Sequence, residues 1–225
     1  LSWIVEGDKE FVIIGNKNAI TYKEVFPLIQ QDKMWLGSTP MSIDLMFRVP
    51  ENLANDLMAS GKEGSAWRRV DGQILGRASA VWFTNLEHGR RHQPLPLMTE
   101  AENIKFSKHK EIRGFGYRTY DNYDAIEVPF TDAIPSDFDG VMGVPISFLN
   151  KYSPEQFEIV GMCENGDLYG MKTQFYSSEE CRDAYMAKFG KPGTYDLNAA
   201  GVILRDGLLE KVYQRILIRH RKVRA

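Results

Sequence analysis

The 225-residue sequence predicts an α/β fold, on three observations near its N-terminus. Residues 10–16 (EFVIIGN) form a continuous apolar run that ends at Gly-Asn, a pattern typical of a strand buried on both faces of a parallel sheet. Residues 18–33 then place apolar side chains at approximately helical spacing, and residues 33–38 (KMWLGS) indicate a second short strand. The order strand, helix, strand is the signature of α/β proteins.

The predicted helix carries both a start signal and an interruption. Thr21 and Glu24 stand at the spacing of a capping box, in which each side chain binds a backbone amide at the start of the helix. Pro27 lies inside the apolar stripe and lacks an amide hydrogen. We therefore expect this helix to be short or kinked.

Extended segments and a hairpin follow. Residues 42–50 indicate another strand, and residues 51–65 a polar loop or a short helix. Asp71-Gly72 supplies a tight turn between two strand-like runs, so residues 66–85 are predicted to form a hairpin. Its long second strand, which ends at residues 81–85, is expected to be antiparallel to its neighbours.

The composition changes from about residue 86, where charge, Gly, Pro and Tyr become frequent and periodicity is lost. A boundary between Pro94 and Glu100 is therefore expected. Near the C-terminus, Asp206-Gly207 predicts a second tight turn, and residues 211–222 alternate as a strand with one buried face does.

Residues 137–161 (DFDGVMGVPISFLNKYSPEQFEIVG) are too irregular for one helix and too apolar for a free loop. Pro145 predicts an extended bend, because proline restricts its own backbone and that of the preceding residue. Ser153 as a helix cap with Pro154 behind it predicts a short helical turn, and residues 157–161 a short strand. We interpret the segment as a rigid platform.

The bulk properties exclude several classes of protein. A hydrophobic content of 43% supports a folded core, and a net charge of −2 gives no global basic field. Cys163 and Cys181 form no CxxC pair, which indicates neither a zinc framework nor a disulfide scaffold, so we expect a cytoplasmic setting. No apolar run approaches the roughly 18 residues of a membrane span.

The common catalytic and metal motifs are absent from the sequence. It contains no GxSxG, HExxH or P-loop motif, and the GFG at residues 114–116 does not follow a buried strand as a cofactor-binding loop does. His88 and His92 have a spacing that could share a metal on a helix. No third ligand is evident, and Gly89 and Pro94 disfavour a helix, so we interpret them as a surface or phosphate-contacting pair and expect no metal.

Local charge is more informative than net charge. Seven Lys or Arg residues lie between residues 88 and 118, with tyrosines following, and six lie between residues 211 and 224 without an acid. Basic groups neutralise phosphates, and aromatic rings stack on bases. The first cluster therefore predicts a nucleic-acid surface, whereas the second equally fits a solvated basic face.

Seven stretches of the sequence resemble, in this order, the C-terminal part of EcoRI-type adenine-specific DNA methyltransferases. They are FVIIGNKNAITYKEVFPLI, KMWLG, FRVP, VWFTNLEHGRRH, YDNYDAIEVP, IPSDFDGVMGVPISFLNKYSPEQFEIVG and RILIR. The resemblance covers nearly the whole chain and implies transfer of a methyl group from S-adenosylmethionine to the exocyclic N6 of adenine in double-stranded DNA. A cognate restriction endonuclease is the partner system that it suggests.

The resemblance also implies an architecture. Residues 1–98 are expected to be the C-terminal part of a Rossmann-like methyltransferase sheet, and residues 99–225 a mixed α+β target-recognition region. Members of the family use an (Asn/Asp/Ser)-Pro-Pro-(Phe/Tyr) tetrapeptide that holds the flipped adenine. The ten prolines of this chain include no adjacent pair, and the glycine-bearing cofactor loop is absent too.

These departures, and an opening at Leu1 that reads as mid-helix, lead us to expect a fragment without a catalytic set; a processed mature protein is the alternative. Asn16 and Asn18 follow a predicted strand and are candidates for the cofactor or adenine pocket, with ordinary turn chemistry as the alternative. The candidate DNA-binding residues are Arg90, Arg91, His92, Arg113, Arg118, Tyr120, Lys151 and Tyr152.

Two alternatives remain open at this point. Lys151 and Tyr152, with Asn150, are presented on the bend after Pro145 and could touch DNA rather than only support a platform. The whole chain could also be a stand-alone DNA-binding module that performs no chemistry.

Overall fold

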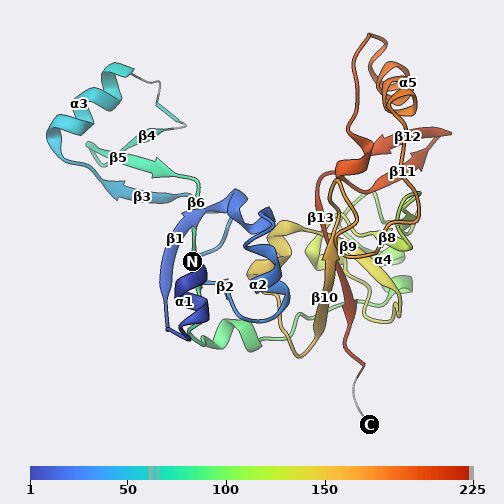
Figure 1. Cartoon of the computed structure of the whole chain (residues 1–225), viewed down its shortest axis with the longest axis horizontal. Helices are drawn as coiled ribbons and strands as arrows, with labels where there is room; N and C mark the ends of the chain where they lie inside the picture. Colours follow the sequence, from blue (N-terminus) through green and yellow to red (C-terminus); the bar gives the residue numbers. More distant parts are fainter. Residues whose placement is uncertain (61–62, 65, 223–225) are drawn as a thin grey trace. The chain divides into compact units, whose positions relative to one another are not determined.

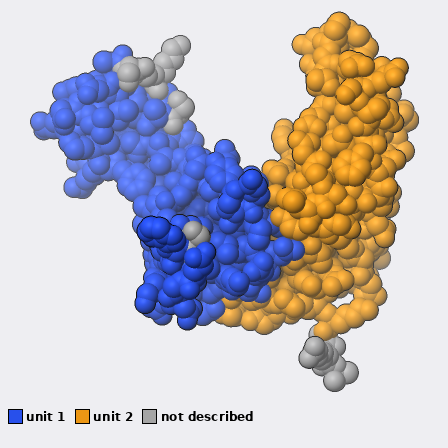
Figure 2. Space-filling view, viewed as in Figure 1, with its two compact units in different colours: residues 1–90 blue, residues 91–225 orange. Residues whose placement is uncertain are grey.

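The structure of the chain, a computed structural model, describes residues 1–60, 63–64 and 66–222. It contains helices and several β-sheets (Figure 1), which confirms a mixed α/β protein. The chain divides into two compact units, residues 1–90 and 91–225, coloured separately in Figure 2. We call them unit 1 and unit 2 and describe each by itself. This division comes earlier than the boundary predicted after residue 98.

The first sheet of unit 1 is antiparallel, not parallel. Its strand order is β1 (Val12–Asn16), β6 (Ala80–Thr84), β2 (Trp35–Leu36), and both pairings are antiparallel. The prediction of a parallel strand buried on both faces was therefore wrong: Val12 and Ile14 on β1 are 54% and 43% exposed. A short apolar run specifies a strand but not the direction of its partner, which comes from residues far along the chain.

The predicted helix of residues 18–33 is split in two. A 3₁₀ turn, η1 (Lys17–Thr21), precedes α2 (Phe26–Gln30), in which Pro27 occupies the first turn. Proline is tolerated there because first-turn amides have no helical partner. The Thr21 hydroxyl donates to the Asn18 carbonyl at 3.0 Å, so the predicted Thr21–Glu24 capping box does not start this helix.

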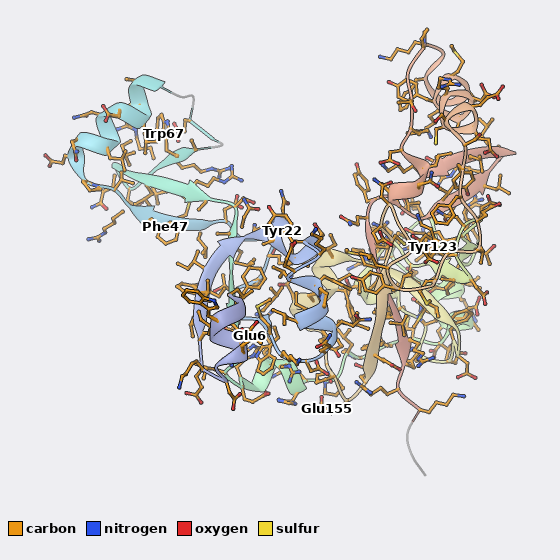
Figure 3. The ribbon with its side chains drawn as sticks, viewed as in Figure 1. Glu6, Tyr22, Phe47, Trp67, Tyr123 and Glu155 are labelled. Atoms are coloured by element: carbon orange, nitrogen blue, oxygen red, sulfur yellow. The ribbon has the colours of Figure 1, made fainter. Side chains whose placement is uncertain are left out.

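A second small sheet in unit 1 has the order β3 (Leu45–Arg48), β5 (Gln73–Ala78), β4 (Trp67–Val70), with α3 (Glu51–Ser60) between β3 and β4. Trp67 is its buried aromatic residue and is labelled with Phe47 in Figure 3. The predicted hairpin is confirmed, because Asp71 and Gly72 both have positive φ, 50° and 78°. The expected long second strand breaks before β6, which belongs to the other sheet.

Unit 2 is built on a five-stranded mixed sheet. In this sheet the pair of β8 (Ala125–Glu127) and β9 (Val141–Pro145) is parallel, and the other three pairs are antiparallel. Its strand order is β10 (Phe157–Met162), β13 (Arg215–His220), β9 (Val141–Pro145), β8 (Ala125–Glu127) and β7 (Arg118–Thr119).

Strand β13 lies between β10 and β9 and supplies much of the core of unit 2. Ile216, Leu217 and Ile218 are fully buried, so the strand is covered on both faces. The alternating pattern predicted for residues 211–222 was therefore wrong. Strand β12 (Leu208–Lys211) ends at Lys211, and in β13 the residues at the C-terminal end are the ones that reach solvent.

Further elements of unit 2 surround this sheet. A β-hairpin turns at Asp206-Gly207, as predicted, with φ of 53° and 79°. The cysteines are free and buried in different clusters, Cys163 beside Tyr120 and Tyr123, and Cys181 beside Tyr176. The remaining elements are α4 (Glu100–Phe106), α5 (Ser178–Phe189), β11 (Val202–Arg205), β12 (Leu208–Lys211) and the short 3₁₀ turns η3 (Thr131–Ala133), η4 (Ile146–Lys151) and η5 (Leu197–Ala199). The 3₁₀ turn η2 (Gly89–His92) spans the end of unit 1 and the start of unit 2 in the sequence.

The irregular segment between β9 and β10 is anchored in this core. Pro145 ends β9, and the η4 turn that follows buries Phe148 and Leu149. The predicted helical turn at Ser153 is a single turn, closed by donation from the amides of Gln156 and Phe157 to the Ser153 carbonyl. The predicted strand after it is present as β10. Within the described ranges, no helix is long and apolar enough to cross a membrane.

Candidate nucleic-acid interface

Helix α4 positions the first basic cluster. Thr99 and Glu102 form a reciprocal capping box, with the Thr99 amide donating to Glu102 Oε2 at 2.8 Å and the Glu102 amide to Thr99 Oγ1 at 3.2 Å. The Thr99 hydroxyl also donates to Glu102 Oε2, at 3.0 Å. The hydrogen bonds from the Thr99 amide and the Thr99 hydroxyl to this carboxylate lower the pKa of Glu102. The carboxylate of Asp137 accepts from the Glu100 amide at 2.7 Å, which ties the helix start to the segment before β9. The Thr-x-x-Glu spacing was visible in the sequence and would have revealed this helix.

The basic loop, which we define as residues 105–118, runs from the last turn of α4 to the first residue of β7 and is held by its own backbone. The Gly114 amide donates to the Ile104 carbonyl at 2.8 Å, and the Gly116 amide donates to the Ile112 carbonyl at 2.9 Å. Ile112 is 1% exposed, so the loop is also anchored by a buried apolar side chain. The loop therefore presents its polar side chains from a fixed backbone.

The basic loop concentrates positive charge on the surface. Lys105, Lys108, Lys110, Arg113 and Arg118 are all exposed, and Glu111 is the single acid among residues 105–118. Closely spaced cations on a defined surface bind phosphates by releasing the counterions of DNA.

One end of the basic loop is fixed by an ion-pair cluster. Lys108 Nζ and His109 Nε2 lie 2.7 and 2.8 Å from the Asp132 carboxylate, and His109 stacks on Phe130 with a centroid separation of 3.6 Å. Partial burial raises the pKa of Asp132, but the hydrogen bonds from Lys108 and His109 outweigh it and lower that pKa overall. Asp132 thus stays ionised and orients the loop.

A second candidate surface is a groove of about 1260 Å³ in unit 2, lined in part by His92, Glu155, Glu158, Arg219, Arg221 and Lys222. Two of its basic side chains are paired with acids. His92 Nδ1 lies 2.6 Å from Glu155 Oε1, and Arg219 Nε donates to Glu158 at 2.8 Å. Glu155 is labelled in Figure 3. This mixed charge makes the groove a weaker phosphate site than the basic loop.

The six basic residues between residues 211 and 224 do not act together as one positively charged surface. Arg215 is buried against Glu127, and Arg221 donates to the Phe157 carbonyl at 3.1 Å. Arg224 lies outside the described residues. These contacts favour a structural role for much of this cluster.

The residues around η2 that were predicted to contact DNA do not share one exposed environment. Arg90 donates to the Ser38 carbonyl within unit 1, and Arg91 is 7% exposed. His92 is half-exposed and bonded to Glu155, while His88 Nε2 lies 2.9 Å from the Leu36 carbonyl. Among the described residues no group of three potential metal ligands occurs.

The other predicted DNA-binding residues fall into an exposed and a buried set. Arg113, Arg118 and Lys151 are exposed. Tyr120 and Tyr152 are 6% and 5% exposed, so their rings pack inside unit 2 and present little surface to a base.

Tyr120 belongs to a buried polar network. Its hydroxyl donates to Glu127 Oε2, and Arg215 Nε donates to Glu127 Oε1 at 3.0 Å. Burial, followed by the charge of Glu127, raises the pKa of Tyr120 well above its usual value. Gly143 and Gly201 leave the space that the ring fills. This role depends on partners far along the chain and has no local signal in the sequence.

Asn16 and Asn18 lie at the end of β1 and are both exposed. The Asn16 side-chain oxygen accepts from the Asn18 amide at 2.8 Å and caps η1. Asn16 is thus engaged in the turn chemistry that was the alternative interpretation, and a place for the pair in the cofactor or adenine pocket stays a prediction.

The chain matches proteins of one family along its length. The family described as "Adenine-specific methyltransferase EcoRI" matches residues 1–221. The Type II methyltransferase M.EcoRI of Escherichia coli is 42% identical over 163 residues, covering 71% of this chain and 45% of that protein.

Two further relatives come from mycoplasmas. M.MpnI of Mycoplasma pneumoniae is 32% identical over 176 residues, covering 77% of this chain and 51% of that protein. M.MgeORF184P of Mycoplasma genitalium is 32% identical over 163 residues, covering 72% and 47%. The chain thus spans about half the length of these relatives, and no solved structure matches it. On the match over residues 1–221, the chain belongs to the EcoRI family of adenine-specific methyltransferases.

Proposed function

We propose that the chain is the DNA-binding part of an adenine-N6 methyltransferase that acts on double-stranded DNA. The observation that carries this proposal is the family match over residues 1–221, which covers both units. We assign unit 1 to the C-terminal part of a Rossmann-like methyltransferase domain and unit 2 to target recognition. The exposed cations of the basic loop support the second assignment.

Membership in a methyltransferase family implies S-adenosylmethionine as methyl donor. The residues described do not fit a cofactor site by themselves, because the Asn16 oxygen is used as a cap and the chain has no Pro-Pro tetrapeptide. We therefore assign no step of methyl transfer to this chain. Its contribution is to bind DNA and fix the register of the duplex.

Phosphate binding follows from the placement of the basic loop. Lys110 and Arg113 are exposed and close in sequence on a backbone closed by hydrogen bonds. Such contacts give affinity without reading sequence. Sequence reading then falls to other side chains of unit 2, for which Arg118, at the end of the basic loop, and Lys151 are candidates.

Two measurements on the complete gene product test this function. The first is transfer of a labelled methyl group from S-adenosylmethionine to adenine N6 in duplex DNA. The second is DNA affinity against salt for Lys110→Ala/Arg113→Ala. Each lost phosphate contact should flatten the slope of log K against log salt by about 0.9. Arg182→Ala/Lys191→Ala removes two exposed cations elsewhere in unit 2 and serves as the matched control.

The alternative of a non-catalytic DNA-binding module gives a different result. It predicts salt-dependent DNA binding with no methyl transfer by the complete gene product. We also propose a cognate restriction endonuclease as partner. Adenine methylation by this protein should then protect its site from cleavage by an endonuclease encoded beside it.

A further inference from the structure

The basic loop carries an exposed aromatic side chain that phosphate binding does not use. Phe115 is 82% exposed, whereas its neighbour Ile112 is 1% exposed. A single exposed apolar residue is common and carries little meaning alone. The backbone that presents Phe115 and the charge around it distinguish this residue from such cases.

The backbone on both sides of Phe115 has a conformation that favours glycine. Gly114 and Gly116 have φ of 86° and 78°, in the left-handed region that L side chains rarely adopt. The Phe115 amide donates to the Ile112 carbonyl at 3.0 Å, and the flanking amides are bonded too. The turn therefore holds Phe115 at its tip without needing to be ordered by a partner, which spares the entropic cost of binding.

The charge around Phe115 identifies a polyanion as its partner. Lys110, Arg113 and Arg118 are exposed within five residues of it, and Glu111 is the acid nearest in sequence. An apolar protein surface would not complement these cations. Duplex DNA, the substrate of the proposed function, offers phosphates outside and an apolar base stack inside. Phe115, which lies between Arg113 and Arg118 in the sequence, matches that arrangement.

We propose that Phe115 is an intercalating wedge, whose ring enters the base stack of duplex DNA while Lys110 and Arg113 bind the adjacent phosphates. This inference rests on the proposed function. An enzyme that modifies a base must take that base out of the stack, and apolar wedges at a base step partly unstack it. Phe115 thereby lowers the cost of exposing the target adenine and acts as a positioning residue rather than a catalytic one.

The first test separates stacking from phosphate contact. Phe115→Ala in the complete gene product should weaken binding to duplex DNA about tenfold or more, in line with measured base–aromatic stacking. The slope of log K against log salt should stay unchanged, because no cation is lost. Phe175→Ala, which removes a 58%-exposed ring of the same unit, is the control and should leave affinity unchanged. Phe115→Trp should restore binding.

The second test observes the ring directly. Phe115→Trp fluorescence should be quenched when duplex DNA binds, and 2-aminopurine beside the target adenine should brighten with wild type and dim again with Phe115→Ala. Thermal melting of each variant checks that the fold is intact. Equal affinity and equal 2-aminopurine signal for Phe115→Ala and wild type would overturn the wedge.

The outcomes distinguish the wedge from the proposed function. Methyl transfer by wild type together with a Phe115→Ala variant that behaves like Phe175→Ala overturns the wedge alone. Duplex binding without methyl transfer, but with the Phe115 effects intact, overturns the enzyme assignment and supports the wedge. A wild-type protein that does not bind duplex DNA overturns both.

Discussion

The Arg215 guanidinium and the Glu127 carboxylate meet across strand β9 inside unit 2. In the ladder, Arg215 lies opposite Pro145 and Glu127 opposite Gly143, so the pair reaches over the strand between them. Arg215 Nε is 3.0 and 3.1 Å from the two carboxylate oxygens, and the side chains are 9% and 8% exposed. The bidentate contact takes the place of the water that would hydrate the two charged groups. The Tyr120 hydroxyl donates a further hydrogen bond to the Glu127 carboxylate.

Breaking this pair from one side should be costly. Arg215→Met leaves the Glu127 charge buried without its partner, and the free energy of unfolding should fall by about 3–5 kcal/mol. Adding Glu127→Leu should recover much of the loss, because the uncompensated charge is then removed. Urea unfolding of the three proteins measures this. Arg219→Met, which breaks an exposed pair with Glu158, is the control and should cost about 1 kcal/mol or less.

Gly143 should tolerate no side chain. A Cβ built there would lie 2.1 Å from the Tyr120 hydroxyl oxygen and 2.7 Å from its ring atoms. Gly143→Ala should therefore lower the free energy of unfolding by about 1–3 kcal/mol through overpacking. The cost should shrink in a Tyr120→Ala background, a non-additivity expected of residues in contact. Gly89→Ala, where a Cβ meets open space, should unfold like wild type.

Asp132 should make stability depend on acidic pH. Its pKa is lowered in the folded chain, so its contribution is fully present above its ordinary value near 3.8 and is lost as pH falls through the lowered folded value. Asp132→Asn should cost no more than about 1 kcal/mol at pH 6, because the carboxylate is 42% exposed and screened by solvent. That difference should narrow on acidification from pH 4 toward pH 2, as measured by urea unfolding. A gap that widens over this range would contradict the assignment.

Pro145 should support the recognition surface through rigidity. Pro145→Gly increases the freedom of the unfolded chain, and unfolding should become easier by roughly 1 kcal/mol. If residues 146–151 are a platform, discrimination between cognate and mismatched duplexes should fall in the same variant of the complete gene product. Lys151→Ala, at an exposed position, should leave stability within about 0.5 kcal/mol of wild type. Full cognate preference retained by Pro145→Gly would count against the platform.

Local chemistry in the sequence predicted the turns of the fold. Asp71-Gly72 and Asp206-Gly207 were both identified because two adjacent residues with positive φ need such side chains. The direction of β1 was not predictable in this way, since its partner β6 lies more than sixty residues later. Strand pairing at that distance is decided by the packing of the whole unit.

The candidate site was also predictable only in part from the sequence. The cations of the basic loop could be counted directly, and Arg113 and Arg118 are exposed as a DNA contact requires. Tyr120 could not be placed, because its burial depends on the absence of side chains at Gly143 and Gly201. The role of Phe115 was equally hidden, since the GFG sequence shows neither the φ angles of its glycines nor the exposure of the ring.

The two buried cysteines provide unit 2 with two natural probes of local opening. Burial raises the pKa of the Cys163 thiol to about 12, so in the folded chain it is protonated and shielded from thiol reagents. Cys163 packs in a cluster with Tyr120 and Leu217 of the central sheet, and Cys181, on α5, packs in a separate cluster with Tyr176. The rate at which each sulfur is alkylated under native conditions therefore reads the opening of its own cluster. Comparing the two alkylation rates with and without duplex DNA therefore shows, without an engineered label, which of the two clusters opens less often when DNA is bound.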